Sequence, residues 1–142
     1  MKEKKQAGFS LIELLLVLAI IGIISGIAIP AFLGQRKRAR VIGDAQSNAK
    51  VLAMMLESRK AEIGIYAASG TTTIWNADGT VTGTNIAPSF TPKGNSKMNF
   101  TASGFVGGLA YTVTAKDTSV TGTPTVLTMD QTGAITVAAA YK

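Results

Sequence analysis

The sequence predicts an α+β fold, in which a long N-terminal α-helix packs on a small antiparallel β-sheet. The first half of the 142-residue chain holds an uncharged apolar run followed by an amphipathic, helix-like pattern. The second half differs sharply in composition, because every threonine lies after Gly70, together with eight of the 15 glycines. The chain has no histidine and no cysteine, which excludes histidine acid/base chemistry, cysteine nucleophiles and disulfides. The residue types that remain are poorly suited to enzymatic catalysis.

The apolar run, residues 14–35, is long enough to cross a membrane. Its 22 uncharged residues would extend about 33 Å as a helix, and a bilayer core is about 30 Å thick. No small-x-small cleavage site follows it, so we expect the run to stay in the chain. The net charge of +6 is concentrated on both sides of the run, and this balance leaves its orientation open.

Residues 36–70 are expected to continue the same helix as an amphipathic segment. Apolar positions recur three, four or seven residues apart, at Ile42, Ala45, Ala49, Leu52, Leu56, Ile63 and Tyr66. We expect the helix to end near residues 67–70, where Ser and Gly precede the change in composition.

Residues 71–142 are expected to form the β domain. Strands are predicted over 109–115, 125–129 and 134–137. The last two would form a hairpin through 130–133, in which Gly133 takes a positive φ. Residues 71–108 are interrupted by Pro and Gly, and we expect loops there with one or two short strands.

The N-terminal string from Lys4 to Glu13 combines a basic leader, a Gly8-Phe9 junction and one acid inside the start of the apolar run. With Pro30 further along, this combination resembles the type IV prepilins. The pseudopilins of type II secretion share the same N-terminus, so the resemblance identifies a superfamily with the pilin fold.

The resemblance implies four segments: a leader peptide (1–8), a transmembrane and assembly helix (9–35), its amphipathic continuation (36–70) and the Thr/Gly-rich β domain (71–142). It implies cleavage between Gly8 and Phe9 by a membrane-embedded prepilin peptidase, which also methylates the Phe9 amine. It places the leader in the cytoplasm and the C-terminal domain outside the inner membrane. After assembly the subunit would lie in a surface pilus. A glycine at the cut site also allows close backbone approach of a protease.

Glu13 is the most informative single residue. An acid in a membrane segment costs about 2.5–3.5 kcal/mol on insertion scales and normally has a partner. The apolar run holds no cation, so we expect Glu13 to pair with the Phe9 amine of a neighbouring subunit, a charge that cleavage creates. The alternative is an interfacial acid that only marks the start of the helix.

Pro30, with Gly22 and Gly26 in the turns before it, predicts a helix hinge, because proline removes a backbone donor and crowds the preceding turn. The alternative is a tolerated membrane proline. The basic cluster, Arg36, Lys37, Arg38 and Arg40, is interpreted as a solvated turn, a headgroup anchor or a contact for acids of a neighbour. The candidate acids are Asp44, Glu57 and Glu62. Nucleic-acid binding is left open only as an activity of an assembled pilus.

No cofactor or metal is expected, because Asp78, Asp117 and Asp130 are too dispersed to form a calcium site. Many pilins close a C-terminal loop with a cysteine pair, which this chain lacks. We expect hydrogen bonding and packing to hold that region.

The leading functional hypothesis is a structural subunit of a type IV pilus that forms a homopolymer through its N-terminal helix. Its further implied partners are the assembly platform and minor pilins. The alternatives are a major pseudopilin of type II secretion and a membrane-anchored binding domain that never polymerises. Motility and adhesion are among the roles of such pili, and the sequence does not choose between them.

Overall fold

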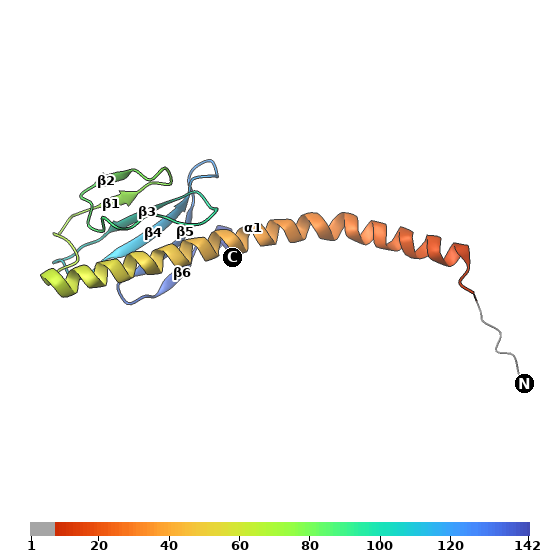
Figure 1. Cartoon of the computed structure of the whole chain (residues 1–142), viewed down its shortest axis with the longest axis horizontal. Coiled ribbons are helices and arrows are strands. Elements are labelled where there is room, and N and C mark those ends of the chain that lie inside the picture. The colour runs from red at the N-terminus through yellow and green to blue at the C-terminus, as the bar shows by residue number, and fades with distance from the viewer. Residues whose placement is uncertain (1–7) are drawn as a thin grey trace, which may run out of the picture. The chain divides into compact units, whose positions relative to one another are not determined.

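The computed structural model describes residues 8–142, and within that range it has the expected α+β architecture (Figure 1). One helix is followed by six strands and a short 3-10 helix, with the bounds α1 Leu11–Ile63, β1 Thr73–Trp75, β2 Val81–Gly83, β3 Met98–Ser103, β4 Thr112–Asp117, β5 Thr125–Asp130, β6 Ile135–Val137 and η1 Ala139–Tyr141. The predicted fold class, a long N-terminal helix with a small antiparallel sheet, is confirmed.

The chain divides into two compact units, one that ends at Lys37 and one that comprises Arg38–Lys142. The first holds the apolar turns of α1. The second holds the remaining turns of α1 and the whole sheet, and we call it the C-terminal domain.

The end of α1 differs from the prediction, since the helix stops at Ile63 and not near residues 67–70. Gly64 explains the difference. Its φ is +85°, and its N–H still donates to the Lys60 carbonyl at 2.8 Å. A glycine in the left-handed region directly after the last helical residue is a common helix stop. The sequence therefore carried an earlier stop signal than the Ser-Gly stretch.

The sheet is fully antiparallel, with the strand order β2-β1-β3-β4-β5-β6. The expected hairpin is present as β5 and β6, and Gly133 has the expected positive φ of +82°. A register shift between Ala115 and Lys116 interrupts the pairing of β4 with β5.

Two strand predictions need correction. The strand expected over 109–115 begins only at Thr112, because the Leu109 N–H donates to the Val106 carbonyl and so belongs to a turn. Residues 71–108 contain three strands and not one or two, and β3 is six residues long. The residues of β3 pair with residues of β1 that are 25 to 29 positions away along the chain and with residues of β4 that are 9 to 19 positions away.

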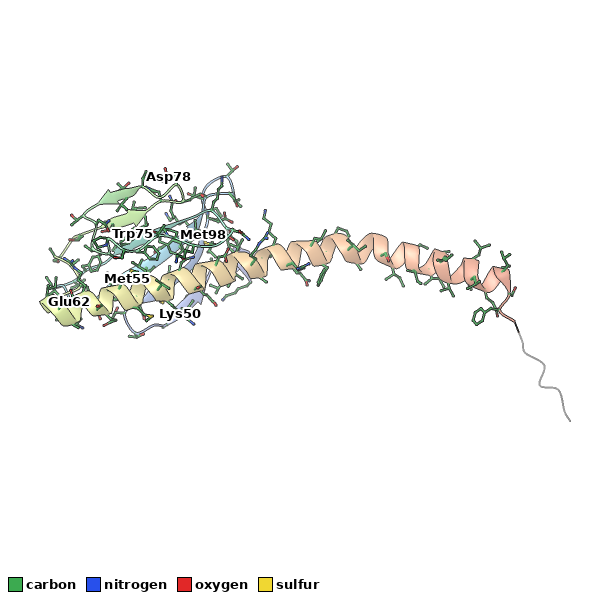
Figure 2. The ribbon with its side chains drawn as sticks, in the orientation of Figure 1. Lys50, Met55, Glu62, Trp75, Asp78 and Met98 are labelled. Atoms are coloured by element: carbon green, nitrogen blue, oxygen red, sulfur yellow. The ribbon has the colours of Figure 1, made fainter. Side chains whose placement is uncertain are left out.

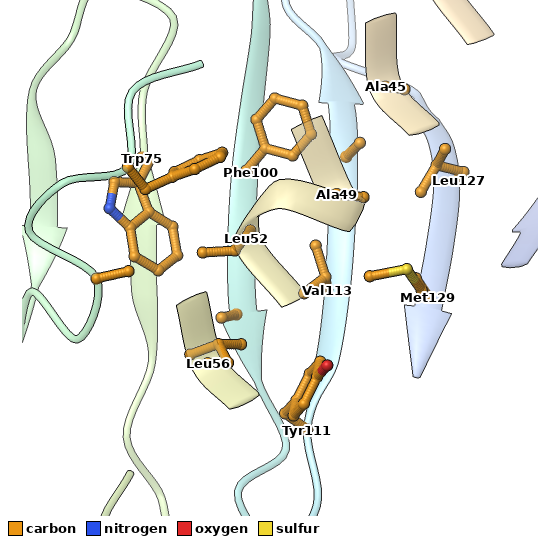
Figure 3. Close-up of a cluster of buried hydrophobic side chains, with 14 of the residues drawn as sticks. Ala45, Ala49, Leu52, Leu56, Trp75, Phe100, Tyr111, Val113, Leu127 and Met129 are labelled. Carbon is orange, nitrogen blue, oxygen red and sulfur yellow. The ribbon is translucent and has the colours of Figure 1, made fainter. Parts of the chain in front are cut away.

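The core of the C-terminal domain lies between α1 and one face of the sheet (Figure 3). Ala45, Ala49, Leu52 and Leu56, spaced three and four residues apart, are fully buried. The short alanine side chains let the helix backbone lie close to the sheet. From the sheet, the fully buried side chains include Phe100, Val113, Val126, Leu127 and Met129. The amphipathic pattern thus predicted these four buried positions of α1, but it was wrong for Ile63, which is exposed, and for Tyr66, which lies beyond the end of the helix.

Candidate functional site

The first candidate site is the start of α1, where Ser10 and Glu13 form a local hydrogen-bonded cap. The Ser10 carbonyl accepts from the N–H groups of Glu13 (3.1 Å) and Leu14 (3.3 Å). The Ser10 N–H in turn donates to Oε2 of Glu13 at 2.8 Å. A glutamate that reaches back from the third helical position to the residue before the helix is one half of a capping box. Glu13 therefore caps the start of the helix, a local role that the sequence analysis did not predict.

Glu13 keeps acceptor capacity beyond this cap. An ionised carboxylate has two oxygens that can accept about four hydrogen bonds, and Ser10 takes one of them. Within residues 8–142 the Oε1 atom has no hydrogen bond, and the side chain is exposed. The carboxylate is thus held in place by the cap while one oxygen is open to a second donor.

Gly8 and Phe9 precede the helix and are exposed, Phe9 at 77%. A Cβ added at Gly8 would meet no heavy atom within 4 Å, so the described part of the chain places no steric demand on that position. A requirement for glycine there would have to come from another molecule. Residues 1–7, the rest of the expected leader, lie outside the described residues.

The apolar turns of α1 expose their large side chains. All the bulky apolar residues from Phe9 to Leu33 are exposed, and an 18-residue window of α1 with a mean hydropathy of 2.7 has none of its residues buried. By length and composition α1 is long and apolar enough to cross a membrane. Exposed side chains of this kind need lipid or other protein surfaces around them.

Pro30 lies inside α1, which continues through it without interruption. Proline has no N–H, so it removes the hydrogen bond that residue 30 would donate to the carbonyl of Gly26. Gly26 and Gly22 lie about one and two turns before Pro30 on the same face, and a Cβ at either would meet open space. The three residues predicted as a hinge therefore share one helix face with a weakened backbone ladder.

The acids proposed as partners for the basic cluster are not equally available. The Asp44 carboxylate accepts from the Ser96 N–H at 3.1 Å and from its hydroxyl at 2.7 Å. Glu57 accepts from the Tyr66 hydroxyl at 2.7 Å. Glu62 is exposed and has no hydrogen bond or ion pair in the described part of the chain.

The loop before β3 is fixed to α1 by two polar side chains. Besides the Asp44 contacts with Ser96, the Asn48 amide donates to the Lys93 carbonyl (2.6 Å) and accepts from the Lys93 N–H (2.8 Å). Gly94 lies between, with φ +116°, and a Cβ there would lie 2.7–2.9 Å from the Asp44 carboxylate. Asn48 is not among the apolar positions of the helical pattern, yet it is buried.

A second polar cluster holds the C-terminal end of the chain. The Tyr141 hydroxyl donates to Oδ2 of the buried Asp117 at 3.0 Å. Oδ1 of Asp117 accepts from the N–H (2.8 Å) and the hydroxyl (2.6 Å) of Ser119. Burial, with the nearby carboxylate, raises the pKa of Tyr141 to about 12. This cluster connects β4 to η1 in a chain without cysteine.

A pair of tyrosines lies in the core of the C-terminal domain. Tyr66 and Tyr111 meet edge to face with ring centroids 4.7 Å apart. Burial, with the nearby Glu57 carboxylate, raises the pKa of Tyr111 to about 12 and also raises the pKa of Tyr66. No group of three His, Cys, Asp or Glu side chains suited to a metal occurs within residues 8–142.

Comparison with known proteins gives two matches. Residues 4–29 match the family model of the prokaryotic N-terminal methylation motif. The chain is also 40% identical over 63 residues to fimbrial protein Q of Moraxella bovis, an alignment that covers 42% of this chain and 40% of that protein. The chain therefore spans less than half the length of this curated relative. No solved structure matches significantly.

Proposed function

We propose that this chain, whose N-terminal motif and fimbrial relative support a type IV pilin family, is a structural subunit that polymerises through α1 into a surface pilus. In this proposal the inner membrane holds the subunit through α1 before assembly, with the C-terminal domain outside the cytoplasm. The prepilin peptidase removes residues 1–8 and methylates the Phe9 amine. A pilin subunit is structural, and the proposal assigns it no chemical step of its own.

The observation that carries the proposal is the exposed apolar part of α1 with one acid fixed at its start. An amine at Phe9 of a neighbouring copy would give Glu13 an opposite charge in a low-dielectric surrounding, where such a pair has its largest effect. The cap with Ser10 holds the carboxylate in one orientation before the neighbour arrives. Because the amine exists only after cleavage, assembly would require prior removal of residues 1–8.

Two substitutions separate the charge of Glu13 from its capping. Glu13→Gln keeps an oxygen that can accept from the Ser10 N–H, since glutamine also serves in capping boxes, but it removes the charge. Glu13→Ala removes both. If attraction to the Phe9 amine drives assembly, both variants should insert and be cleaved, yet give at least about tenfold less sheared filament than the parent, which corresponds to about 1.4 kcal/mol.

The measurement is the ratio of sheared filament to membrane-pool subunit for each variant, with mass spectrometry of the N-terminus. A normal yield from Glu13→Gln and a low yield from Glu13→Ala would assign Glu13 to helix capping alone. Normal yields from both would refute the assembly role. Filaments that keep residues 1–8 on most copies would refute the processing step.

The pseudopilin alternative shares the N-terminal motif. It differs from the pilus proposal in the location of the polymer, which would not extend from the cell surface. A pilus subunit would be recovered from sheared cell-surface material, and its deletion would leave protein secretion intact. Loss of secretion upon deletion, with pili retained, would favour a major pseudopilin. A membrane-anchored domain that never polymerises would give neither filaments nor a secretion defect.

A further inference from the structure

Four exposed aliphatic side chains belong to the last residue of α1 and to two neighbouring turns outside the helix. They are Ile63, Ile65, Val106 and Leu109, with exposed fractions of 53%, 37%, 74% and 58%. We call these four residues the terminal surface. In water such a cluster favours contact with another apolar surface.

The terminal surface is held in shape by the backbone of the two turns. The Tyr66 N–H donates to the Gly108 carbonyl at 2.9 Å, and the Leu109 N–H donates to the Val106 carbonyl at 3.1 Å. Gly108 has φ +75°, and a Cβ there would lie 2.9 Å from the side chain of Ile65. The two turns therefore lie in contact, and the surface is preformed.

Glu62 adds a negative charge beside this surface. Figure 2 shows it at the end of the helix, one residue before Ile63. Two nearby cations are directed to Tyr66: the Arg59 Nε donates to its carbonyl at 2.9 Å, and the Lys60 Nζ lies 4.5 Å from its ring centroid. Glu62, in contrast, makes no hydrogen bond or ion pair within residues 8–142.

The opposite end of the helix in this domain carries the complementary charge. Arg38 and Arg40 are exposed, and the sequence has no acid between Glu13 and Asp44. Asp44 itself is engaged with Ser96. Arg38 lies 24 residues before Glu62 on one helix, about 36 Å away at 1.5 Å per residue. The two ends of one domain therefore cannot pair with each other, whereas those of two copies can.

We propose that the terminal surface and Glu62 bind the Arg38–Arg40 turn of a second copy of this chain, head to tail. The arginine stems would cover the aliphatic side chains, while a guanidinium pairs with the Glu62 carboxylate in bidentate geometry. A contact between two different ends of identical subunits leaves each end open to a further copy, which produces an extended polymer. The inference rests on the proposed filament function and assigns a domain contact within it.

Disulfide cross-linking tests this contact directly, because the parent chain has no cysteine. The variant to be tested carries Glu62→Cys together with Arg38→Cys, and it is assembled into filaments before oxidation. A disulfide needs Cβ atoms about 3.5–4.5 Å apart, so these two positions cannot join within one copy. After oxidation we expect a ladder of multimers on a non-reducing gel. The matched control is Lys50→Cys with Arg38→Cys. Lys50 is exposed and lies on α1 midway in sequence between Arg38 and Glu62 (Figure 2), so this pair should give no ladder.

Charge reversal gives a second, independent readout. Glu62→Lys should lower the filament yield at least fivefold, and adding Arg38→Glu should restore at least half of the parent yield. Both residues are exposed, so the variants should melt at the parent temperature, which confirms that folding is unaffected.

The outcomes separate this contact from the filament proposal. Filaments that form normally, give no Glu62–Arg38 ladder and tolerate Glu62→Lys would overturn the contact and leave the pilus function standing. A ladder as strong from the Lys50 control, or a cross-link of Glu62→Cys to a different protein, would also overturn it. Absence of filaments from the parent chain would refute the proposed function, and this contact with it.

Discussion

The hydroxyl of Tyr141 should contribute measurably to the stability of the C-terminal domain. It donates to the buried Asp117 carboxylate at 3.0 Å, whereas its ring packs against the core. Tyr141→Phe removes the hydroxyl and keeps the ring. A hydrogen bond to a charged group is worth about 1.5–3 kcal/mol, and in a domain of this size each kcal/mol shifts the melting temperature by about 4–8 °C. We therefore expect the melting temperature to fall by roughly 6 °C or more.

The assay is thermal unfolding of the full-length chain in detergent, followed by near-UV circular dichroism. Tyr111→Phe is the matched control, because it removes the hydroxyl of a buried tyrosine whose side chain makes no hydrogen bond within residues 8–142. It should change stability by no more than about 0.5 kcal/mol. Equal melting of Tyr141→Phe and the parent would refute the argument, as would an equal loss in both variants.

Three further predictions concern pH and glycine. The pKa of Tyr141 is raised from 10.0 to about 12, so the stability that its hydroxyl contributes is complete below pH 10 and is lost as the pH rises toward 12. In melting scans from pH 8 to 12, the melting temperature of Tyr141→Phe should therefore fall less at alkaline pH than that of the parent chain. Gly94→Ala should destabilise the domain by about 1–3 kcal/mol and more than Gly133→Ala, since both have positive φ but only Gly94 abuts the Asp44 carboxylate; equal losses in denaturant titrations would contradict this. Gly8→Leu should leave an uncleaved precursor although the chain itself has room for the side chain, and efficient cleavage, detected by mass spectrometry, would contradict the assigned junction.

The elements that the sequence predicted well are those with a strong local signal. The uncharged run and the three-four spacing of Ala45, Ala49, Leu52 and Leu56 predicted α1 and its buried face. The turn at Asp130–Gly133 predicted the β5–β6 hairpin. In contrast, β3 alternates buried and half-buried residues from Met98 onward, but Met, Asn, Ala and Ser have weak β-propensity. Pairing with distant strands, which no short window contains, decides its conformation.

The same distinction applies to the candidate site. The apolar surroundings of Glu13 mark it in the sequence. The capping bond from the Ser10 N–H to its carboxylate is a local contact that was not among the sequence predictions, although Ser10 and Glu13 have the spacing of a capping box. The Asp117–Tyr141 contact joins residues 24 positions apart, and no motif marks it. Likewise, the sequence named three acids as partners of the basic cluster. Only the structure shows that Asp44 and Glu57 already have hydrogen-bonding partners.

Subunits held in a bilayer need polar contacts to assemble, because hydrophobic burial alone offers little gain. The apolar side chains of α1 are exposed in the single chain, but lipid already shields such side chains from water, so helix association in a membrane depends on close packing and polar pairing. In the proposed filament, a charged pair at Glu13 would supply this pairing inside the membrane. The Glu62 contact would act outside it, where water makes each ion pair weaker but apolar burial at the terminal surface is favourable. The two contacts should therefore respond differently to salt. The quantity to compare is the filament yield of each variant relative to the parent chain at the same ionic strength. If this relative yield changes with ionic strength for Glu62 variants but not for Glu13 variants, the two contacts lie in the two surroundings proposed here.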